Sequence, residues 1–177
     1  KTVYPLTPAE YAKQMKALGL DYGSLKGLNP RLVVAAISPF GATGPYKDYK
    51  GEAITCCAFS GVSDQIGDAD CEPLNLPLSI CDYQAAMAAT SGILLALFHR
   101  DRSGEGQFVD ISESEVMATV QREGVWADYY SLGKVHRRDG HRRSGHLYPH
   151  TILPCKDGHM CLIAVEGRQY KRFLEIM

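Results

Sequence analysis

The sequence predicts an α/β fold with a largely parallel sheet, followed by the start of a smaller α+β domain. Two short segments, Leu32 to Ile37 and Gln107 to Ile111, are expected to be strands. The first run is wholly apolar and partly β-branched, as in a strand covered on both faces. Helical segments with short loops lie around these runs, and the order strand, helix, strand, helix is typical of a parallel sheet.

The first expected helix has a clear beginning and end. Thr7-Pro8-Ala9-Glu10 combines a capping box with proline at the first helical position, and Gly19 ends the helix after Leu18. A loop dense in glycine and proline, Ser38 to Pro45, follows the first strand. A helical stretch from about Ala53 to Val62 comes next.

The most apolar stretch runs from Ala85 to Phe98. It is rich in Ala and Leu and apolar nearly all round, which predicts a buried helix rather than a surface helix. Its 14 residues are too few to span a bilayer. After the second strand, a further capping box from Ser112 to Glu115 predicts a helix that extends to about Leu132.

The character of the sequence changes after Leu132. The segment from Lys134 to His150 holds five Lys or Arg, one Asp and four His, with no apolar periodicity. It predicts a basic linker, which either meets a partner subunit or a phosphorylated ligand or is simply a solvated loop. Beyond it, the apolar segments Thr151 to Leu153 and Met160 to Val165 flank an Asp157-Gly158 turn, which predicts a hairpin.

Composition and charge exclude several classes of protein. The chain has 177 residues, of which 45% are apolar and 22% charged, so it is not disordered, collagen-like or a coiled coil. The net charge is −1, which gives no global electrostatic reason to expect nucleic acid or an anionic membrane as a partner.

The cysteine pattern indicates free thiols. Six cysteines occur without a C-x-x-C pair, and the histidine spacings are loose, so we expect no disulfide framework and no metal site. Buried thiols in a reducing cytosol are the expectation, and no export signal is visible, so we expect a cytoplasmic protein. Because the chain begins at Lys1 and stops at Met177 inside a helix expected from Arg168, we treat it as a segment of a longer protein.

Asp82 is the carboxylate of greatest chemical interest. It follows an apolar stretch and precedes the apolar helix. From position alone, the simpler interpretation is an N-cap, which accepts hydrogen bonds from the first-turn N–H groups. The functional alternative is a carboxylate that attacks an activated acyl group while neighbouring N–H groups stabilise an oxyanion.

Several short motifs, in order along the chain, together resemble the central segment of class III CoA-transferases of the CaiB/BaiF type. That family includes formyl-CoA and carnitine CoA-transferases, with α-methylacyl-CoA racemases as relatives. The motifs are Leu18 to Tyr22, Leu28 to Val33, Ile37 to Gly41, Thr43 to Pro45, Ser60-Gly61, Gly92 to Leu94, Arg102 to Asp110 and Pro154 to Gly158. The resemblance implies that residues 1–132 form the later part of a Rossmann-like large domain, 133–148 a basic linker and 149–177 the start of a small domain.

The resemblance further implies that Asp82 is the nucleophile of a CoA transfer. In the family, this carboxylate attacks an acyl-CoA, and an aspartyl-CoA thioester forms and is then attacked by an acceptor carboxylic acid. Coenzyme A is therefore expected as a substrate, and no other cofactor is expected. Gly104-Glu105-Gly106 precedes a strand rather than following one, so it is not a dinucleotide-binding motif.

The family contacts CoA at positions that correspond here to Phe40, Tyr49, Lys50, Gly51 and Glu52. Glu52 stands where related racemases place a proton-transferring histidine. This departure weakens the racemase alternative, although a carboxylate is also able to act as a base.

A substrate loop is expected at Gly145, His146 and Tyr148. The corresponding loop of formyl-CoA:oxalate enzymes is glycine-rich, and the sequence here is not, which counts against oxalate as the acceptor. Family members are interlocked homodimers, so a homodimer is expected. A third alternative is a catalytically incomplete segment that acts only in dimerisation.

Overall fold

The computed structural model describes residues 7–120, 125–138 and 149–176. The chain divides into two compact units. Unit 1 comprises Lys1–Val62 and Asn75–Arg122, and unit 2 comprises Ser63–Leu74 and Glu123–Met177. The expected division at residues 132 and 148 stays a prediction, and each unit is described by itself.

Unit 1 contains a parallel two-stranded sheet, as expected. Strand β1 (Val34–Ser38) pairs with β2 (Phe108–Ser112), with Val34 opposite Phe108 and Ser38 opposite Ser112. Because the strands are parallel and in register, both end at the same edge of the sheet. Ile37 is exposed, so the first strand is not covered on both faces within this chain.

The backbone enters this pairing through a close approach at Gly106. Its N–H donates to the carbonyl of Pro30, and a Cβ added at Gly106 would overlap the carbonyl of Leu32. The Tyr22 hydroxyl also donates to the Gly106 carbonyl, at 3.2 Å. Position 106 therefore requires glycine, because there is no space for a side chain.

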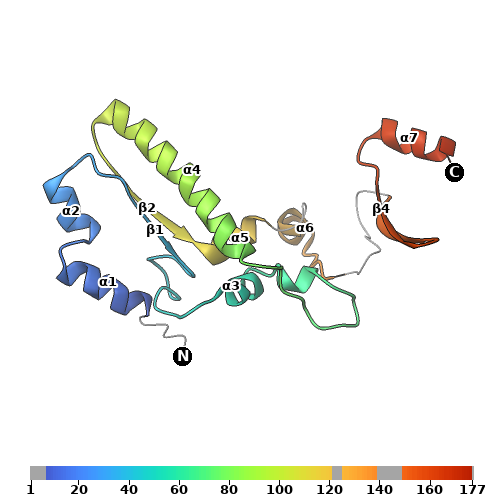
Figure 1. Ribbon diagram of the computed structural model, residues 1–177, viewed down its shortest axis with the longest axis horizontal. Helices are drawn as coiled ribbons and strands as arrows, with labels where there is room; N and C mark the ends of the chain where they lie inside the picture. The colour runs from blue at the N-terminus through green and yellow to red at the C-terminus, as the bar shows by residue number, and fades with distance from the viewer. Residues whose placement is uncertain (1–6, 121–124, 139–148, 177) are drawn as a thin grey trace. The chain divides into compact units, whose positions relative to one another are not determined.

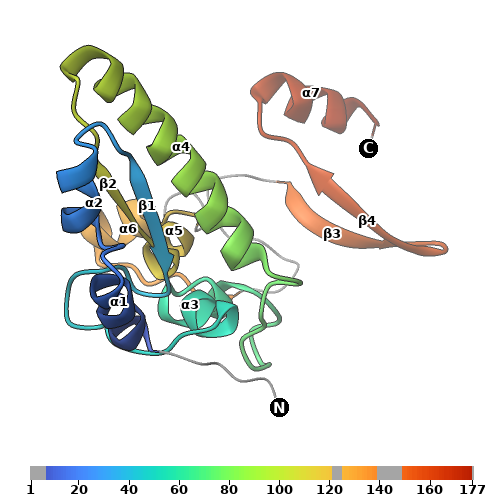
Figure 2. The same cartoon turned by 60° about the vertical axis from the view of Figure 1, so that its left-hand side comes forward.

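Helix α4 (Ile80–Ser103) lies alongside β1 and β2 (Figures 1 and 2). Its small residues Ala85, Ala89 and Ala96 are buried, and a Cβ added at Gly92 would lie 2.8 Å from Val109 Cγ1. Small side chains thus allow the helix to approach the sheet closely.

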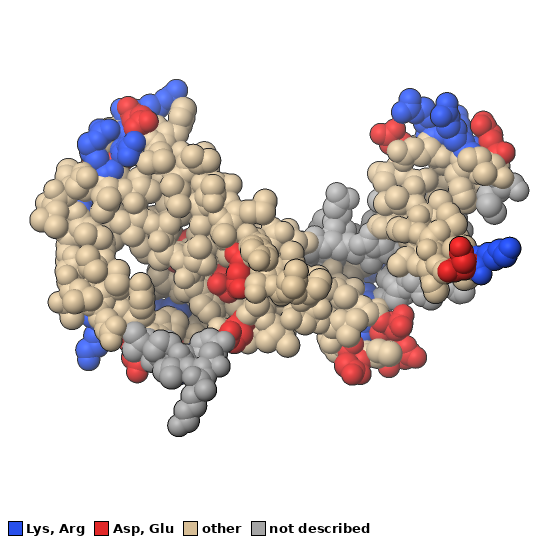
Figure 3. All heavy atoms as spheres, in the orientation of Figure 1, with Lys and Arg blue, Asp and Glu red and all other residues tan. Residues whose placement is uncertain are grey.

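The prediction that this apolar helix is buried all round is wrong for the described residues. Leu94, Leu95 and Phe98 are each more than half exposed, at 61%, 70% and 58%. The reason is geometric, because a two-stranded sheet covers one face of a helix and leaves the other uncovered. Figure 3 shows uncharged atoms over much of unit 1, with Lys and Arg gathered near the end of α4 that holds Arg100 and Arg102.

The expected length of this helix was also too short. The helix has 24 residues, so by length and composition alone it is able to cross a membrane. One such helix is weak evidence, because the core helix of a soluble protein passes the same test.

Four further helices lie in the described part of unit 1, and the second of them was not predicted from the sequence. They are α1 (Pro8–Ala17), α2 (Tyr22–Leu28), α3 (Ala53–Phe59) and α5 (Glu113–Thr119). The capping box at α1 is formed: the Thr7 N–H donates to Glu10 Oε2, and the Glu10 N–H donates to Thr7 Oγ1. The helix expected to continue to Leu132 ends instead at Thr119, and α6 (Val125–Leu132) is a separate helix of unit 2.

Unit 2 contains the expected hairpin and a terminal helix. Strands β3 (His150–Cys155) and β4 (Gly158–Ile163) pair antiparallel around Lys156 and Asp157, and α7 (Gly167–Ile176) follows. The short 3₁₀ helix η1 (Ser63–Gln65) also belongs to this unit.

One residue of the expected basic linker is a structural anchor in unit 2. The Arg138 guanidinium donates to Asp64 Oδ1 at 2.9 Å and to the carbonyls of Asp68 and Cys71. Its side chain is only 15% exposed. The interpretation of a wholly solvated loop is therefore wrong at this residue.

Replacing Gly106 by alanine should destabilise the folded protein by about 3 kcal/mol or more, because the added methyl overlaps the Leu32 backbone. The matched control is Gly27→Ala in α2, where an added Cβ meets nothing within 4 Å and helix propensity favours alanine by about 0.5–1 kcal/mol. The free energy of unfolding from denaturant titration measures both. Equal stability of the two variants would contradict the close approach.

Candidate active site

Asp82 lies in the first turn of α4 and is exposed. It is the third residue of the helix, and the N-cap is Ser79, whose side chain makes no capping hydrogen bond. The interpretation of Asp82 as the N-cap is thus wrong by three positions. A carboxylate in the first turn still lies in the favourable field of the helix N-terminus, close to N–H groups that lack intrahelical partners.

A second carboxylate, Glu113, lies near Asp82 at the beginning of α5. It is half-buried, and burial is the main reason why its pKa is raised. The negative charges of Asp82 and, more weakly, Glu52 raise the pKa further, while hydrogen bonds from Cys56 and Cys81 oppose the shift. The fold therefore brings three carboxylates close together: Glu52, Asp82 and Glu113, at the beginnings of α3, α4 and α5.

Three thiols pack beside these carboxylates. Cys56, Cys57 and Cys81 are buried, with at most 2% of each residue exposed. Burial, followed by the charge of Glu113, raises the pKa of Cys56 to about 12, and burial also raises the pKa of Cys57 and Cys81. These thiols are therefore protonated at neutral pH and are poor nucleophiles.

The expectation of buried free thiols is thus confirmed for three cysteines and wrong for the other three. All six cysteines are free, but Cys71, Cys155 and Cys161 are exposed. These three lie in a loop and on the hairpin of unit 2, where the chain has little to cover them.

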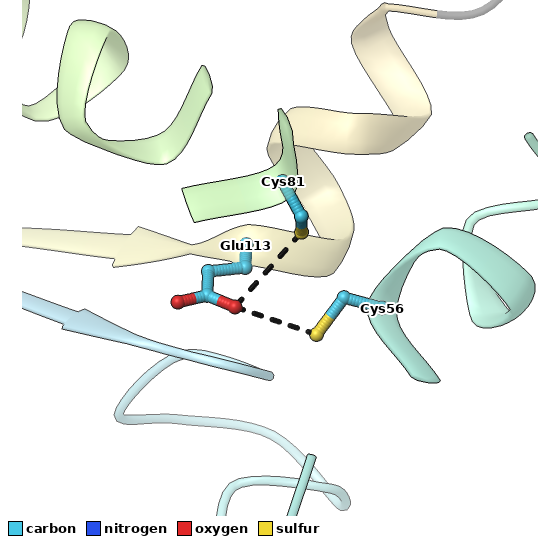
Figure 4. A group of neighbouring side chains, drawn as sticks. All are labelled: Cys56, Cys81 and Glu113. Atoms are coloured by element: carbon cyan, nitrogen blue, oxygen red, sulfur yellow. Dashed lines mark hydrogen bonds between the residues drawn. The ribbon is translucent and has the colours of Figure 1, made fainter. Parts of the chain in front are cut away.

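Cys56, Cys81 and Glu113 come from α3, α4 and α5 and point toward one another (Figure 4). One ligand atom from each residue lies within 4.8 Å of the other two. Sequence spacing did not indicate this group, because its members are 25 and 32 residues apart and only the fold brings them together.

Two of the residues expected to bind CoA are in direct contact. Gly51 lies so close to the loop after β1 that an added Cβ would be 2.6 Å from Pro39 Cβ and 3.1 Å from Phe40 Cε2. Phe40 also meets the rings of Phe59 and Tyr46, at centroid distances of 5.3 Å and 6.1 Å. The loop and the end of α3 are therefore held together by aromatic packing.

The other expected CoA contacts flank this aromatic group. Tyr49 packs against Tyr46 at 5.5 Å and remains 59% exposed. Glu52 is the N-cap residue of α3 without a capping side-chain bond. Lys50 is exposed and lies near Glu10, whose pKa is lowered mainly by hydrogen bonds from Thr7 and additionally by the Lys50 charge.

Asp110 fastens the loop after β1 and was noted in the sequence only as part of a motif. Both of its carboxylate oxygens accept from the N–H of Ala42, at 3.0 Å and 2.9 Å. Ser114 N–H donates to the Pro39 carbonyl at 3.1 Å. Gly41, between them, has a φ of +81° and therefore favours glycine.

The expected substrate-loop residues Gly145, His146 and Tyr148 lie outside the described residues.

The sequence profile of CoA-transferase family III matches residues 8–177. This chain belongs to that family. The resemblance drawn from the motifs is therefore confirmed, over nearly the whole sequence.

Individual family members show the same relationship. The succinate–glutarate CoA-transferase of Agrobacterium fabrum is 32% identical over 159 residues, which is 90% of this chain and 39% of that protein. The succinyl-CoA:(R)-benzylsuccinate CoA-transferase subunit BbsE of Thauera aromatica is 37% identical over 156 residues, covering 87% of this chain and 36% of that protein. The family III chain described here thus spans less than half the length of these relatives.

The fold is also that of a solved family member. The crystal structure of a CaiB/BaiF family protein from Brucella suis superposes with a TM-score of 0.78 at 28% identity. The match covers 93% of this chain and 43% of that one. The α/β architecture expected from the sequence is therefore confirmed.

The two kinds of thiol should differ in reactivity with iodoacetamide. Cys71, Cys155 and Cys161 should be modified first, whereas Cys56 and Cys81 should resist until the protein unfolds, because burial blocks access and disfavours the thiolate. Since a raised thiol pKa moves thiolate formation to higher pH, raising the pH to about 8.5 should not speed modification of Cys56 and Cys81 in the folded protein. Peptide mass spectrometry measures each rate, and equal rates in the folded protein would contradict the described burial.

Proposed function

We propose that the protein transfers CoA between an acyl-CoA donor and a carboxylic acid acceptor through an aspartyl-CoA thioester on Asp82. The position of Asp82 carries the proposal: its carboxylate is exposed and lies in the first turn of α4. The chain that contains it belongs to CoA-transferase family III.

The proposed chemistry balances without an added base. The Asp82 carboxylate attacks the donor thioester carbonyl, the C–S bond breaks, and a mixed anhydride and CoA thiolate form. The thiolate then attacks the aspartyl carbonyl of the anhydride and releases the donor acid. The acceptor carboxylate repeats the sequence in reverse, which regenerates Asp82 and yields the new acyl-CoA. A carboxylate suits this role because it is itself the attacking group and needs no neighbouring base to activate it.

The local structure supports the tetrahedral steps. Each attack develops negative charge on a carbonyl oxygen, and the first-turn N–H groups of α4 lie beside Asp82 with no intrahelical partner. The aromatic group around Phe40 and Tyr49, together with the Lys50 cation, supplies apolar and positively charged contacts that suit CoA. We propose these residues, Gly51 and Glu52 as the CoA contacts, and the segment with Gly145, His146 and Tyr148 as the substrate loop.

The names of the relatives suggest a substrate class. Those of Agrobacterium fabrum and Thauera aromatica are named for succinate, glutarate and benzylsuccinate, all dicarboxylic acids. We therefore propose a dicarboxylic acid as the acceptor and succinyl-CoA as the first donor to test. The proposed assembly is a cytoplasmic homodimer, for which the exposed apolar face of α4 offers a contact surface.

An acyl-CoA racemase or epimerase is the second candidate function. The charges of both Asp82 and Glu52 raise the pKa of the same Glu113 carboxyl, so both side chains lie near Glu113. This proximity of two ionisable groups supports the second candidate. Transfer of an α-proton needs two such groups on opposite sides of a substrate carbon.

The transferase proposal predicts a covalent adduct on Asp82. The full-length protein, mixed with succinyl-CoA and then hydroxylamine, should carry a hydroxamate on the Asp82 peptide. Asp82→Ala should abolish the adduct and lower kcat by about a thousandfold or more, because the nucleophile is lost. Asp101→Asn is the matched control, since Asp101 is an exposed carboxylate near the far end of α4. A hydroxamate that persists in Asp82→Ala would disprove the assignment.

The racemase alternative predicts a different signal. With acyl-CoA in deuterium oxide and no acceptor acid, a racemase would incorporate deuterium at the α-carbon, and Glu52→Gln would slow that exchange. For the transferase we expect no exchange beyond the protein-free rate, measured by mass spectrometry of the recovered acyl-CoA. If acyl-CoA binds and neither exchange nor adduct appears, the segment takes no catalytic part and the third alternative, a dimerisation role, stands.

A further inference from the structure

The cluster of Cys56, Cys81 and Glu113 has the chemistry of a metal site. Cys56 Sγ lies 3.6 Å and Cys81 Sγ 3.9 Å from the same oxygen, Glu113 Oε2 (Figure 4). The two sulfur atoms also lie within 4.8 Å of each other. Three ligand-type atoms thus surround one small volume between α3, α4 and α5.

The spacing of these atoms matches the edges of a tetrahedral zinc site. With Zn–S bonds of about 2.3 Å and a Zn–O bond of about 2.0–2.2 Å, tetrahedral angles place sulfur and oxygen about 3.6 Å apart. The same bond lengths place two sulfur atoms about 3.8 Å apart. The two observed sulfur–oxygen distances require a movement of a few tenths of an ångström at most.

We propose that Cys56, Cys81 and Glu113 bind one thiophilic divalent cation of the Zn²⁺ type. Two sulfur ligands select such a cation over Mg²⁺ or Ca²⁺, which prefer oxygen. Binding releases one proton from each thiol to the solvent, so two thiolates and one carboxylate face the cation. One coordination position remains for water or an added ligand, as in zinc sites with three protein ligands.

The environment of Glu113 favours a cation over hydrogen bonding alone. Its carboxylate is half-buried, and within the described part of the chain its hydrogen-bond donors are the two thiols, which are weak donors. Burying a carboxylate removes its hydrogen bonds to water, and weak donors replace only part of the free energy that is lost. A bound cation would supply the missing compensation.

The site would act on the position of Asp82 rather than on substrate. Cys81 directly precedes Asp82 in α4, so a cation held there would join the beginning of that helix to α3 and α5. Glu113 would then be a metal ligand held in a fixed position. Because two protons leave as the cation binds, the net charge of the cluster beside Asp82 would stay at that of one carboxylate. The proposal does not depend on CoA transfer, because metal content is measured without substrate.

The experiment uses untagged full-length protein, stripped with chelator and kept reduced by a phosphine. Zn²⁺ should bind with one equivalent attributable to this site, and X-ray absorption at the zinc edge should show two sulfur ligands at about 2.3 Å with lighter atoms inside them. Co²⁺ should give the sulfur-to-cobalt charge-transfer band of a dithiolate site. Zn²⁺ should also raise Tm, since it binds the folded state.

The variants separate the ligands from their neighbours. Cys56→Ser, Cys81→Ser and Glu113→Gln should each weaken Zn²⁺ affinity by at least about tenfold. Cys57→Ser is the matched control, because Cys57 is equally buried and adjacent in sequence but is not one of the three clustered residues. Cys71→Ser controls for an exposed thiol.

Three results would overturn the proposal. They are the absence of sulfur from the zinc shell of the wild-type protein, Zn²⁺ binding unchanged in Glu113→Gln and Cys81→Ser, and equal loss of binding in Cys57→Ser. Since the X-ray absorption measurement uses the wild-type protein, misfolding of a variant does not prevent a decision. A hydroxamate on Asp82 with no bound zinc would reject the metal site and leave the transferase proposal intact.

Discussion

The parallel pairing of β1 with β2 is the constraint on which the rest of unit 1 depends. It requires the backbone at Gly106 to pass directly against Leu32, and it places Ser38 opposite Ser112. Both strands therefore end at one edge of the sheet, from which the chain continues into the Phe40 loop and into α5. Binding sites of open parallel sheets lie outside this edge, because the connecting loops and helix beginnings meet there.

Electrostatics at this edge follow from the meeting of helix beginnings. Glu52, Asp82 and Glu113 come from α3, α4 and α5, and each gains from the field of its own helix. The pKa of Glu113 is raised mainly because burial disfavours its charge, and the negative charges of Asp82 and Glu52 raise it further. Asp82 is exposed to solvent, whereas Glu113 is half-buried and accepts hydrogen bonds from Cys56 and Cys81.

The exposed face of α4 shows what the two strands do not cover. Leu94, Leu95 and Phe98 are apolar and mostly exposed, and the relatives that the chain matches are more than twice its length. Apolar surface of this kind is stabilised by burial against other protein. The exposed face of α4 is therefore the part of unit 1 that would gain most from burial.

Local signals in the sequence determined most of the elements. The capping box at Thr7 and the apolar run of β1 each depend on neighbouring residues, and both form as expected. The hairpin also forms, but its turn is Lys156-Asp157 rather than Asp157-Gly158. The short motifs distributed along the chain also indicated the family. Local signals did not indicate the structural role of Arg138. Its hydrogen bonds to Asp64 and to the loop after Asp64 join residues about 70 positions apart in the sequence.

Only the tertiary structure decided which side chains meet at the edge of the sheet. Cys56, Cys81 and Glu113 carry no recognisable spacing, and their convergence follows from how α3, α4 and α5 pack around two strands. The same holds for the burial of α4, where composition sets the apolar character but the width of the sheet sets the covered face. Sequence patterns report interactions between near neighbours, whereas a site assembled from three helices is a property of their packing.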